Sequence, residues 1–537
     1  MRNVITLDCT LRDGGYVNGW NFGFENIKKV LQSLALSEIN IIECGFLSNK
    51  SEFSNNETRF NNLPAADFFI PKNKNNIKYV CMINYGEFDI SEIPNRNETM
   101  LDGIRIAFHK EELYGAMNLA KELKTKGFLV FLQPMVTIRY MDKELLELIT
   151  MTNEIEPYSL YIVDSFGVMK EKDLIRMFLL IDNNLNTEIT IGYHSHNNMQ
   201  LSYSNAQKLT TLTTKRQIII DSSVMGMGRG AGNLNTELFL NYLNENYDTN
   251  YKIAPLLDII DEVLNKIYSL NYWGYSLSHF LSASYNCHPN YATFLDGKST
   301  LTVKAISDIL NKLDSNQKCN YNKSYIEKLY LEYQSNIVDD SEVLKYLANY
   351  FKGKNVLLAA PGSNLRKYQE EVKKVIAEKR MSVITVNFIN KDIESDFVFV
   401  SNLKRFDRIN KDNHIKDSKF IVTSNIKDIG DNCLVVNYNT LINNYNTIVD
   451  NAAIMLIKLL IKLSVDKVYV AGLDGYSYNQ NENYIEKDMQ IVADADTIKE
   501  MNSDISNVIS HLSKEIKIEF LTPSRYRSKS ILGSRVI

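Results

Sequence analysis

The sequence VITLDCTLRDGGY, residues 4–16, starts as a short apolar strand and ends in two charged residues and two glycines. Charged groups at the end of a buried strand are costly unless they face an open, polar cavity. Asp13 offers an oxygen ligand for a hard divalent cation, and Arg12 offers a rigid positive fork for a carboxylate or enolate. A salt bridge at the end of a strand, followed by a loop, explains the same residues. The choice between a functional site and a salt bridge therefore depends on the rest of the chain.

Short apolar segments recur along the first half of the chain, and most of them are separated by segments with helical spacing. This alternation predicts an α/β fold, a closed (β/α)8 barrel, with an open doubly wound sheet as the alternative. The predicted strands are residues 4–7, 39–45, 78–83, 103–109, 128–133, 160–165, 189–196 and 218–222.

Polar residues gather at the carboxyl ends of these strands, the face that carries the chemistry in barrels of this kind. They are Asp13, Glu43, His109, Gln133, Asp164, His194 and His196. His194 and His196 alternate along one strand, so both point the same way and can bind one metal ion, although two ordinary histidines explain them equally well.

A glycine-rich loop, GMGRGAGN at residues 226–233, directly follows the eighth strand, where barrels often place anion or substrate contacts. Asp13 lies close to the two histidines only if the barrel closes. One oxygen and two nitrogen ligands with open positions suit Mn²⁺, Mg²⁺ or Zn²⁺. The metal hypothesis therefore depends on closure of the barrel.

Three motifs in this order, TLRDG at 10–14, HxH at 194–196 and GxGRxxGN at 226–233, resemble the metal-dependent aldolase and lyase barrels. That superfamily includes 4-hydroxy-2-oxovalerate aldolase, hydroxymethylglutaryl-CoA lyase and isopropylmalate synthase. The resemblance covers Met1 to about Tyr275. It implies a divalent cation, Mn²⁺ before Mg²⁺ or Zn²⁺, and an enolate of a 2-oxo acid steadied by Arg12. The implied metal ligands are Asp13, His194, His196 and Asn233.

One position departs from the pattern of the aldolases, which carry a histidine as general base three residues after the metal-binding aspartate. This chain has Tyr16 there, and tyrosine ordinarily titrates near pH 10, so it is a poor base. Tyr16 would instead donate a hydrogen bond, while a metal-bound water or His109 moves the proton. His109 is equally explained as a strand-end histidine without a role.

Residues 273–351 resemble the helical extension that follows the barrel in the hydroxy-oxovalerate aldolases and supplies a tyrosine near the active site. Tyr275 and Tyr291 are the candidates, and plain packing is the alternative for both. The expected catalytic residues are Arg12, Tyr16, His109 and Tyr275. The expected substrate contacts are Glu43, Gln133, Ser165, Gly228, Arg229 and Tyr291.

Residues 352–537 alternate again between strands and helices, which predicts a Rossmann-like open parallel sheet. Their pattern resembles 6-hydroxymethylpterin diphosphokinases and sialyltransferase-like glycosyltransferases. The resemblance implies a nucleotide or sugar-nucleotide site and a second, transferase activity; a domain kept for assembly is the alternative. The implied site residues are Ser363, Asn387, Asn402, Arg405 and Asp474.

Composition narrows the classes of function. The net charge of −4 gives no basic footprint for nucleic acid or anionic lipid. Six scattered cysteines and the absence of a leader pattern favour a reducing cytoplasm. The most apolar helical segment, residues 452–463, contains Lys458 and Lys462, which argues against a membrane span.

The domains expected are thus a barrel (1–272), a helical extension (273–351) and a Rossmann-like domain (352–537). We expect a homodimeric lyase that makes or breaks a C–C bond through the metal-chelated enolate of a pyruvate-type 2-oxo acid, with an aldehyde or acyl co-substrate. Surface polysaccharide or unusual sugar biosynthesis is the expected context. A Claisen-type acyl-CoA synthase and a non-catalytic scaffold with a vestigial barrel are the alternatives.

Overall fold

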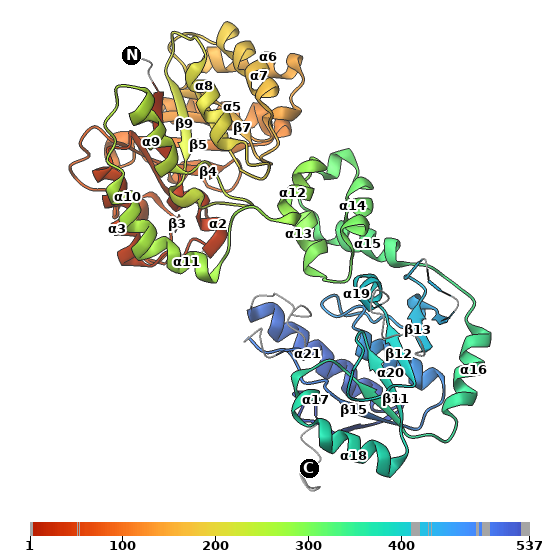
Figure 1. Cartoon of the computed structure of the whole chain (residues 1–537). Helices are drawn as coiled ribbons and strands as arrows, with labels where there is room; N and C mark the ends of the chain where they lie inside the picture. The colour runs from red at the N-terminus through yellow and green to blue at the C-terminus, as the bar shows by residue number, and fades with distance from the viewer. Residues whose placement is uncertain are drawn as a thin grey trace. The chain divides into compact units, whose positions relative to one another are not determined.

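The computed structural model describes residues 4–50, 52, 54–409, 419–427, 429–430, 432–478, 483–485 and 495–527. The chain divides into two compact units, coloured from red to green and from green to blue in Figure 1. The first unit is Met1–Asn290 with Asp314–Tyr321, and the second is Tyr291–Leu313 with Asn322–Ile537. The boundaries expected after residues 272 and 351 stay predictions, because the helices between them are divided between the two units.

The first unit contains a closed parallel barrel, which confirms the predicted fold. Its strands follow in the order β1-β9-β8-β7-β6-β5-β4-β2, and β1 pairs with β2 through Leu7 and Ile41 to close the ring. A two-residue strand, β3 (Arg59–Phe60), extends the sheet beside β2. The barrel strands are β1 Val4–Asp8, β2 Ile41–Leu47, β4 Lys78–Asn84, β5 Gly103–Phe108, β6 Leu129–Pro134, β7 Ser159–Asp164, β8 Thr190–Ser195 and β9 Ile218–Ser222.

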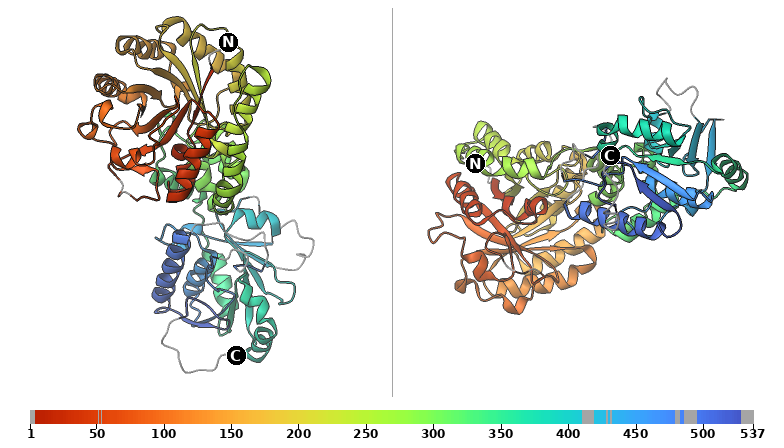
Figure 2. Two further views of the ribbon diagram at one scale, coloured as in Figure 1. Left: turned by 90° about the vertical axis from the view of Figure 1, so that its left-hand side faces the viewer. Right: turned by 90° about the horizontal axis from the view of Figure 1, so that it is seen from below.

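Amphipathic helices cover the outside of the barrel, as the views in Figures 1 and 2 show. Between β4 and β5 the described chain has two 3₁₀ turns, η1 (Ile90–Glu92) and η2 (Arg96–Glu98), in place of an α-helix. The helices that follow the strands are α3 Phe24–Leu36, α4 Leu63–Asp67, α5 Leu113–Thr125, α6 Asp142–Ile155, α7 Glu171–Asn184, α8 Ser202–Thr211 and α9 Thr236–Asn246. Beyond them lie α10 Ala254–Ile259, η6 Ile260–Leu264, α11 Asn265–Leu270 and α12 Leu277–Ser284.

Strand β2 shows how the alternation of side chains builds two cores. Ile41 packs with Leu7 and Phe131 inside the barrel, whereas Ile42 and Cys44 belong to the large core under the helices. Successive residues of a strand point to opposite faces, so Glu43 is on the same face as Ile41. The barrel interior therefore receives a carboxylate from a strand that is otherwise apolar.

The quoted N-terminal segment differs from the expectation in one respect. Strand β1 ends at Asp8, and Thr10–Asp13 form a helical turn, α1, so Asp13 lies beyond the strand. The carboxylate of Asp8 accepts a hydrogen bond from the backbone N–H of Thr10 at 2.9 Å, which starts this turn. The turn brings Arg12 and Asp13 over the carboxyl ends of the strands.

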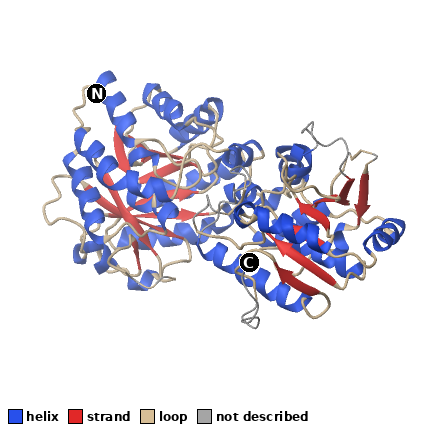
Figure 3. Ribbon diagram, turned by 60° about the horizontal axis from the view of Figure 1, so that its bottom comes forward, coloured by secondary structure: helices blue, strands red, loops and turns tan. Residues whose placement is uncertain are grey.

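The second unit contains a parallel sheet in the order β14-β13-β12-β11-β10-β15-β16, the predicted open α/β arrangement. Figure 3 shows both sheets in red among their blue helices. Its strands are β10 Val356–Ala359, β11 Ser382–Val386, β12 Phe397–Val400, β13 Lys419–Thr423, β14 Cys433–Val436, β15 Lys467–Ala471 and β16 Lys517–Phe520. Its helices are α13 Pro289–Gly297, α14 Val303–Asn311, α15 Lys323–Gln334, α16 Ser341–Phe351, α17 Ser363–Lys367, α18 Gln369–Lys379, α19 Leu403–Ile409, α20 Ala452–Lys462 and α21 Ala495–Leu512.

Two further predictions concern the whole chain. None of the helices in the described residues is long and apolar enough to cross a membrane. All six cysteines are free thiols.

Candidate metal centre

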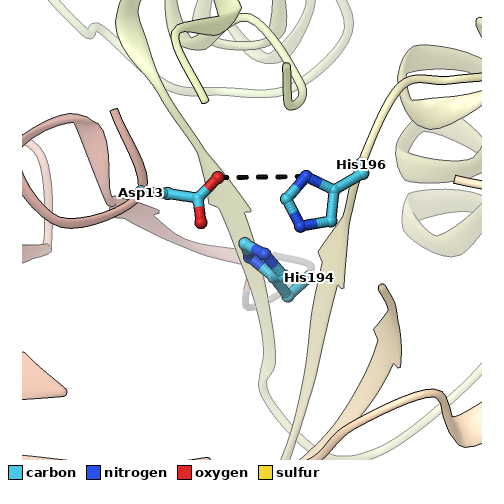
Figure 4. A group of neighbouring side chains, drawn as sticks. All are labelled: Asp13, His194 and His196. Atoms are coloured by element: carbon cyan, nitrogen blue, oxygen red, sulfur yellow. Dashed lines mark ion pairs between the residues drawn. The ribbon is translucent and has the colours of Figure 1, made fainter. Parts of the chain in front are cut away.

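Asp13, His194 and His196 converge at the carboxyl ends of the barrel strands. One carboxylate oxygen and one nitrogen of each imidazole all lie within 4.8 Å of one another, and the three side chains are buried. Nδ1 of His196 lies 3.9 Å from Oδ2 of Asp13, the contact drawn dashed in Figure 4. The closure of β1 against β9 and of β9 against β8 is what brings α1 to the two histidines.

His194 is held in place by Asp221, a residue on the neighbouring strand β9. Nδ1 of His194 lies 3.0 Å from Oδ2 of Asp221, and because a carboxylate only accepts, Nδ1 carries the hydrogen. Nε2 of His194 is then left with its lone pair for a cation. Tyr161 donates a hydrogen bond of 3.0 Å to the other oxygen of Asp221.

A buried arginine links Asp221 to the other side of the barrel. Arg105 pairs with Asp221, and its Nη1 donates to Glu43 at 2.8 Å. Nε of Arg12 donates to the same Glu43 oxygen at 2.8 Å, and Nη1 of Arg12 pairs with Asp13. A continuous chain of hydrogen bonds and ion pairs thus fixes both sides of the metal cluster.

The protonation states of the cluster suit cation binding. Burial alone would raise the pKa of Asp13, but Arg12 and the two imidazoles hold it well below its ordinary value. Burial lowers the pKa of His196 to about 4, although Asp13 opposes this shift. At neutral pH the carboxylate is therefore ionised and His196 is neutral, the forms in which both bind metals.

Several buried polar atoms at the cluster have no hydrogen-bond partner in the structure. They include Nδ1 of His196, Oδ1 of Asn233 and Nη2 of Arg12. Buried polar atoms are rarely left unpaired, so their grouping at one place indicates a ligand. The charges point the same way, because the network contains the carboxylates of Asp13, Glu43 and Asp221 but only two guanidinium groups. The residues present therefore fit a divalent cation and an anionic substrate.

The glycine-rich loop forms one wall of the site. Nδ2 of Asn233 donates to Oδ2 of Asp13 at 2.6 Å, which fixes the side-chain amide of Asn233 beside the cluster. Oδ1 of Asn233 has no partner and is a candidate fourth ligand. A Cβ at Gly228 would lie 2.5 Å from that same Asp13 oxygen and 2.3 Å from Nδ2 of Asn233. Only glycine lets the loop backbone come this close.

Four further predicted residues of the barrel are Tyr16, His109, Gln133 and Ser165. Tyr16 packs edge-on against Trp20, and desolvation raises the pKa of its hydroxyl, with Arg229 opposing the shift. His109 follows β5, where its backbone N–H donates to Glu112. Gln133 is buried at the end of β6, and Ser165 accepts a hydrogen bond from the N–H of Val136.

The two tyrosines proposed from the helical extension belong to different units. Tyr275 is 53% exposed, and its ring is tilted by 54° against that of Phe280, 6.4 Å away between centres. Tyr291 belongs to the second unit, where it is fully buried and its hydroxyl accepts a hydrogen bond from the N–H of Asn322. The roles assigned to them remain predictions.

Asp221, Arg105 and His288 were not among the predicted residues, although all three are part of this site or its rim. Asp221 and Arg105 are charged residues within apolar strands, IIIDS and GIRIAF. Because an unpaired charge is costly in a core, this interruption was the signal that could have identified them. His288 sits in a loop after the barrel, and no pattern in the sequence connects it with the site.

The second unit has a cavity of about 600 Å³ at the carboxyl ends of β10, β11, β12 and β15. Strands β10 and β15 are where the strand order reverses, the usual binding position in open α/β sheets. Of the predicted residues, the cavity is lined by Asn387, Asn402, Arg405 and Asp474. Ser363 is not part of the lining, but its hydroxyl lies 3.4 Å from Asp474.

Comparison with known proteins identifies the family to which the barrel is similar. The HMGL-like family matches residues 95–263. The 4-hydroxy-2-oxovalerate aldolase of Geobacillus genomosp. 3 is 24% identical over 274 residues, 49% of this chain and 77% of that protein. The aldolase of the same name from Geobacillus thermodenitrificans is 25% identical over 279 residues, 50% of this chain and 77% of that protein. These findings support the metal-dependent aldolase and lyase superfamily for the barrel, and the identity of the C-terminal domain stays a prediction.

Proposed function

We propose that the barrel makes or breaks a C–C bond next to a pyruvate-type 2-oxo acid, in the manner of a 4-hydroxy-2-oxovalerate aldolase, with an aldehyde as partner. The observation that carries this proposal is the convergence of Asp13, His194 and His196 beside unpaired atoms of Arg12 and Asn233. We propose Mn²⁺ as the cation, with Mg²⁺ or Zn²⁺ as alternatives. When bound, such a cation acts as a Lewis acid on the 2-oxo acid and favours its enolate.

Arg12 and Tyr16 supply hydrogen bonds to the substrate in this proposal. Nη2 of Arg12 has no partner, so it is available to the substrate carboxylate or to the developing enolate oxygen. Arg12 is fixed by Glu43 on one side and Asp13 on the other, which aims this free N–H without loss of side-chain freedom on binding. Tyr16 keeps its proton at neutral pH, because tyrosine ordinarily titrates near pH 10 and desolvation raises its pKa further, so it acts as a hydrogen-bond donor.

The direct test is exchange of the methyl protons of pyruvate in deuterated water, followed by NMR on Mn²⁺-loaded protein. We expect exchange without coenzyme A, and loss of exchange and of bound metal in Asp13→Asn. Asp142→Asn is the matched control, since Asp142 lies on α6 and pairs only with the exposed Arg176 among the described residues. Exchange that strictly requires an acyl-CoA would favour the Claisen-type synthase.

Bound metal without enolisation of any 2-oxo acid would favour the non-catalytic scaffold. The departure at Tyr16 is the feature that keeps this second candidate open.

We further propose that the second unit binds a nucleotide or sugar nucleotide and carries a transferase activity. The cavity supports this, because its size is that of small-molecule sites and it opens where the strand order reverses. Titration calorimetry with nucleoside diphosphates and sugar nucleotides tests binding to the second unit, and heats equal to dilution for all of them would refute it.

We also propose that the protein is a homodimer, that it is located in the cytoplasm, and that it acts in surface polysaccharide or unusual sugar biosynthesis.

A further inference from the structure

Arg229 and His288 meet at the rim of the metal centre, although 59 residues separate them in the chain. Nη2 of Arg229 contacts Nε2 of His288. The guanidinium group of Arg229 also lies over the ring of Tyr16, 5.3 Å from its centre. Arg229 and His196 both act on the pKa of His288, so the pair lies within electrostatic reach of the metal ligands.

The contact joins a guanidinium N–H to a ring nitrogen of His288, and the tautomer of the ring sets whether that nitrogen accepts or donates. Nδ1 of His288 lies 3.2 Å from the backbone N–H of Asn290 and accepts from it. Burial, reinforced by Arg229, lowers the pKa of His288 to about 3, so the ring is neutral at neutral pH. A neutral imidazole carries its single hydrogen on Nδ1 or on Nε2, so the ring adds no charge to this contact. The positive charge at the contact is that of Arg229.

The charge of Arg229 favours an anionic acceptor. Arg12 and Arg105 are each paired with carboxylates, whereas Arg229 forms no ion pair within the part of the chain that the structure describes. Arg229 is only partly exposed, so its charge is less screened than at an open surface. The ring of His288 is held between Phe166, edge-on at 6.5 Å, and Tyr321, stacked at 5.8 Å. His288 is therefore fixed beside the positive charge of Arg229.

We propose that Arg229 and His288 bind an anionic group, a carboxylate or a phosphate, on the second substrate of the barrel. In the condensation direction this group belongs to the aldehyde, and in the cleavage direction it lies at the far end of the 4-hydroxy-2-oxo acid. The inference rests on the proposed function, in which the carboxylate of the 2-oxo acid already has a partner in Arg12. It adds that the aldehyde is negatively charged.

Paired aldehydes test this on the full-length, Mn²⁺-loaded protein with pyruvate. Succinic semialdehyde is compared with butanal, and glyceraldehyde 3-phosphate with glyceraldehyde. We expect kcat/KM to favour the anionic member of one pair by about tenfold or more, the worth of a charged hydrogen bond, and that pair identifies carboxylate or phosphate. Arg229→Gln and His288→Gln should each bring the ratio toward one. Arg176→Gln, an exposed arginine on α7, should keep the wild-type ratio.

Equal kcat/KM values for both members of each pair, or a preference that survives in both variants, would overturn the inference. If no aldehyde is turned over, succinate and inorganic phosphate are titrated by calorimetry into the wild-type protein with and without Mn²⁺. Binding of one anion that weakens about tenfold in Arg229→Gln supports the inference, and binding of neither contradicts it. Failure of the proposed function has a different signature, namely no bound Mn²⁺ and no exchange of pyruvate protons.

Discussion

The metal centre of the barrel and the cavity of the second unit are built on opposite principles. The metal centre is buried, and residues far apart in the chain, such as Asp13 and His196, meet there. Because water is excluded, their charges can be balanced only by one another or by a bound ligand. The cavity is a space of about 600 Å³ lined by amides, hydroxyls, aromatic rings, glycines and aliphatic side chains, with both signs of charge, including Arg405 and Asp474. The first arrangement prescribes its ligand narrowly, while the second prescribes only the size and polarity of its ligand.

Removal of an imidazole from the cluster is expected to give the largest effect. His194→Ala removes one of the three charged or nitrogen ligands, so we expect the affinity for Mn²⁺ to fall by about a thousandfold or more. Metal analysis after dialysis, with Mn²⁺ titrated by calorimetry, measures this. Ligand binding by the second unit should be unaffected, and a parallel loss there would break the contrast between the two sites.

A smaller effect is expected for the residue that orients His194. Asp221→Asn keeps the shape but removes the charge that fixes the hydrogen at Nδ1 of His194, so the affinity for Mn²⁺ should fall by about 10–100-fold. The same titration measures it, with Asp142→Asn as control. An affinity equal to wild type would mean that Asp221 only fills space.

The cavity should respond to charge removal more weakly. Arg405→Gln is expected to weaken a bound nucleoside diphosphate or sugar nucleotide by about tenfold, because one cationic contact among many neutral ones is lost. Calorimetry gives the binding constant. Lys419→Gln, at an exposed lysine of the same unit, is the control. Any change in the metal content of Arg405→Gln would contradict the independence of the two sites.

Asp8 and Asp13, five residues apart, give the smallest test. Burial raises the pKa of Asp8 to about 6, in contrast to Asp13. The folded protein then binds a proton that the unfolded chain releases near its ordinary value, so Asp8 contributes a fall of about 1 kcal/mol in the free energy of unfolding between pH 5 and 7. Burial also raises the pKa of Asp164 to about 6, so Asp8→Asn should make the slope shallower by the contribution of Asp8 and leave that of Asp164.

Tryptophan fluorescence during urea unfolding reports the barrel, because Trp20 and Trp273 both belong to the first unit. Asp142→Asn is again the control. A slope that is the same in Asp8→Asn and in wild type would show that Asp8 does not titrate in this range.

The sequence could predict the barrel because its strands carry an unambiguous pattern. In β2, Ile41 and Glu43 face inward while Ile42 and Cys44 face the helices. At the carboxyl ends, Asp13, His194 and His196 are polar residue types that are rarely buried unless they have a partner or a ligand. The short helical turn at Thr10–Asp13 and the strand β16 were not predicted, since neither has a periodic pattern long enough to be recognised.

Other features depend on contacts that no local pattern specifies. The pairing of Arg105 with Asp221 joins strands 116 residues apart, and the approach of His288 to Arg229 requires the loop after the barrel to fold back. The placement of Tyr291 in the second unit depends on the same tertiary packing. The cavity of the second unit is lined by residue types that are common on any surface, so its extent emerges only from the folded chain.

The most direct test of the metal centre is anomalous diffraction from crystals soaked with Mn²⁺ and oxalate. We predict a single strong peak bound by Asp13, His194 and His196, with oxalate beside it and Arg12 turned to the oxalate. A peak elsewhere, or an intact cluster without a peak at a saturating Mn²⁺ concentration, would contradict the account.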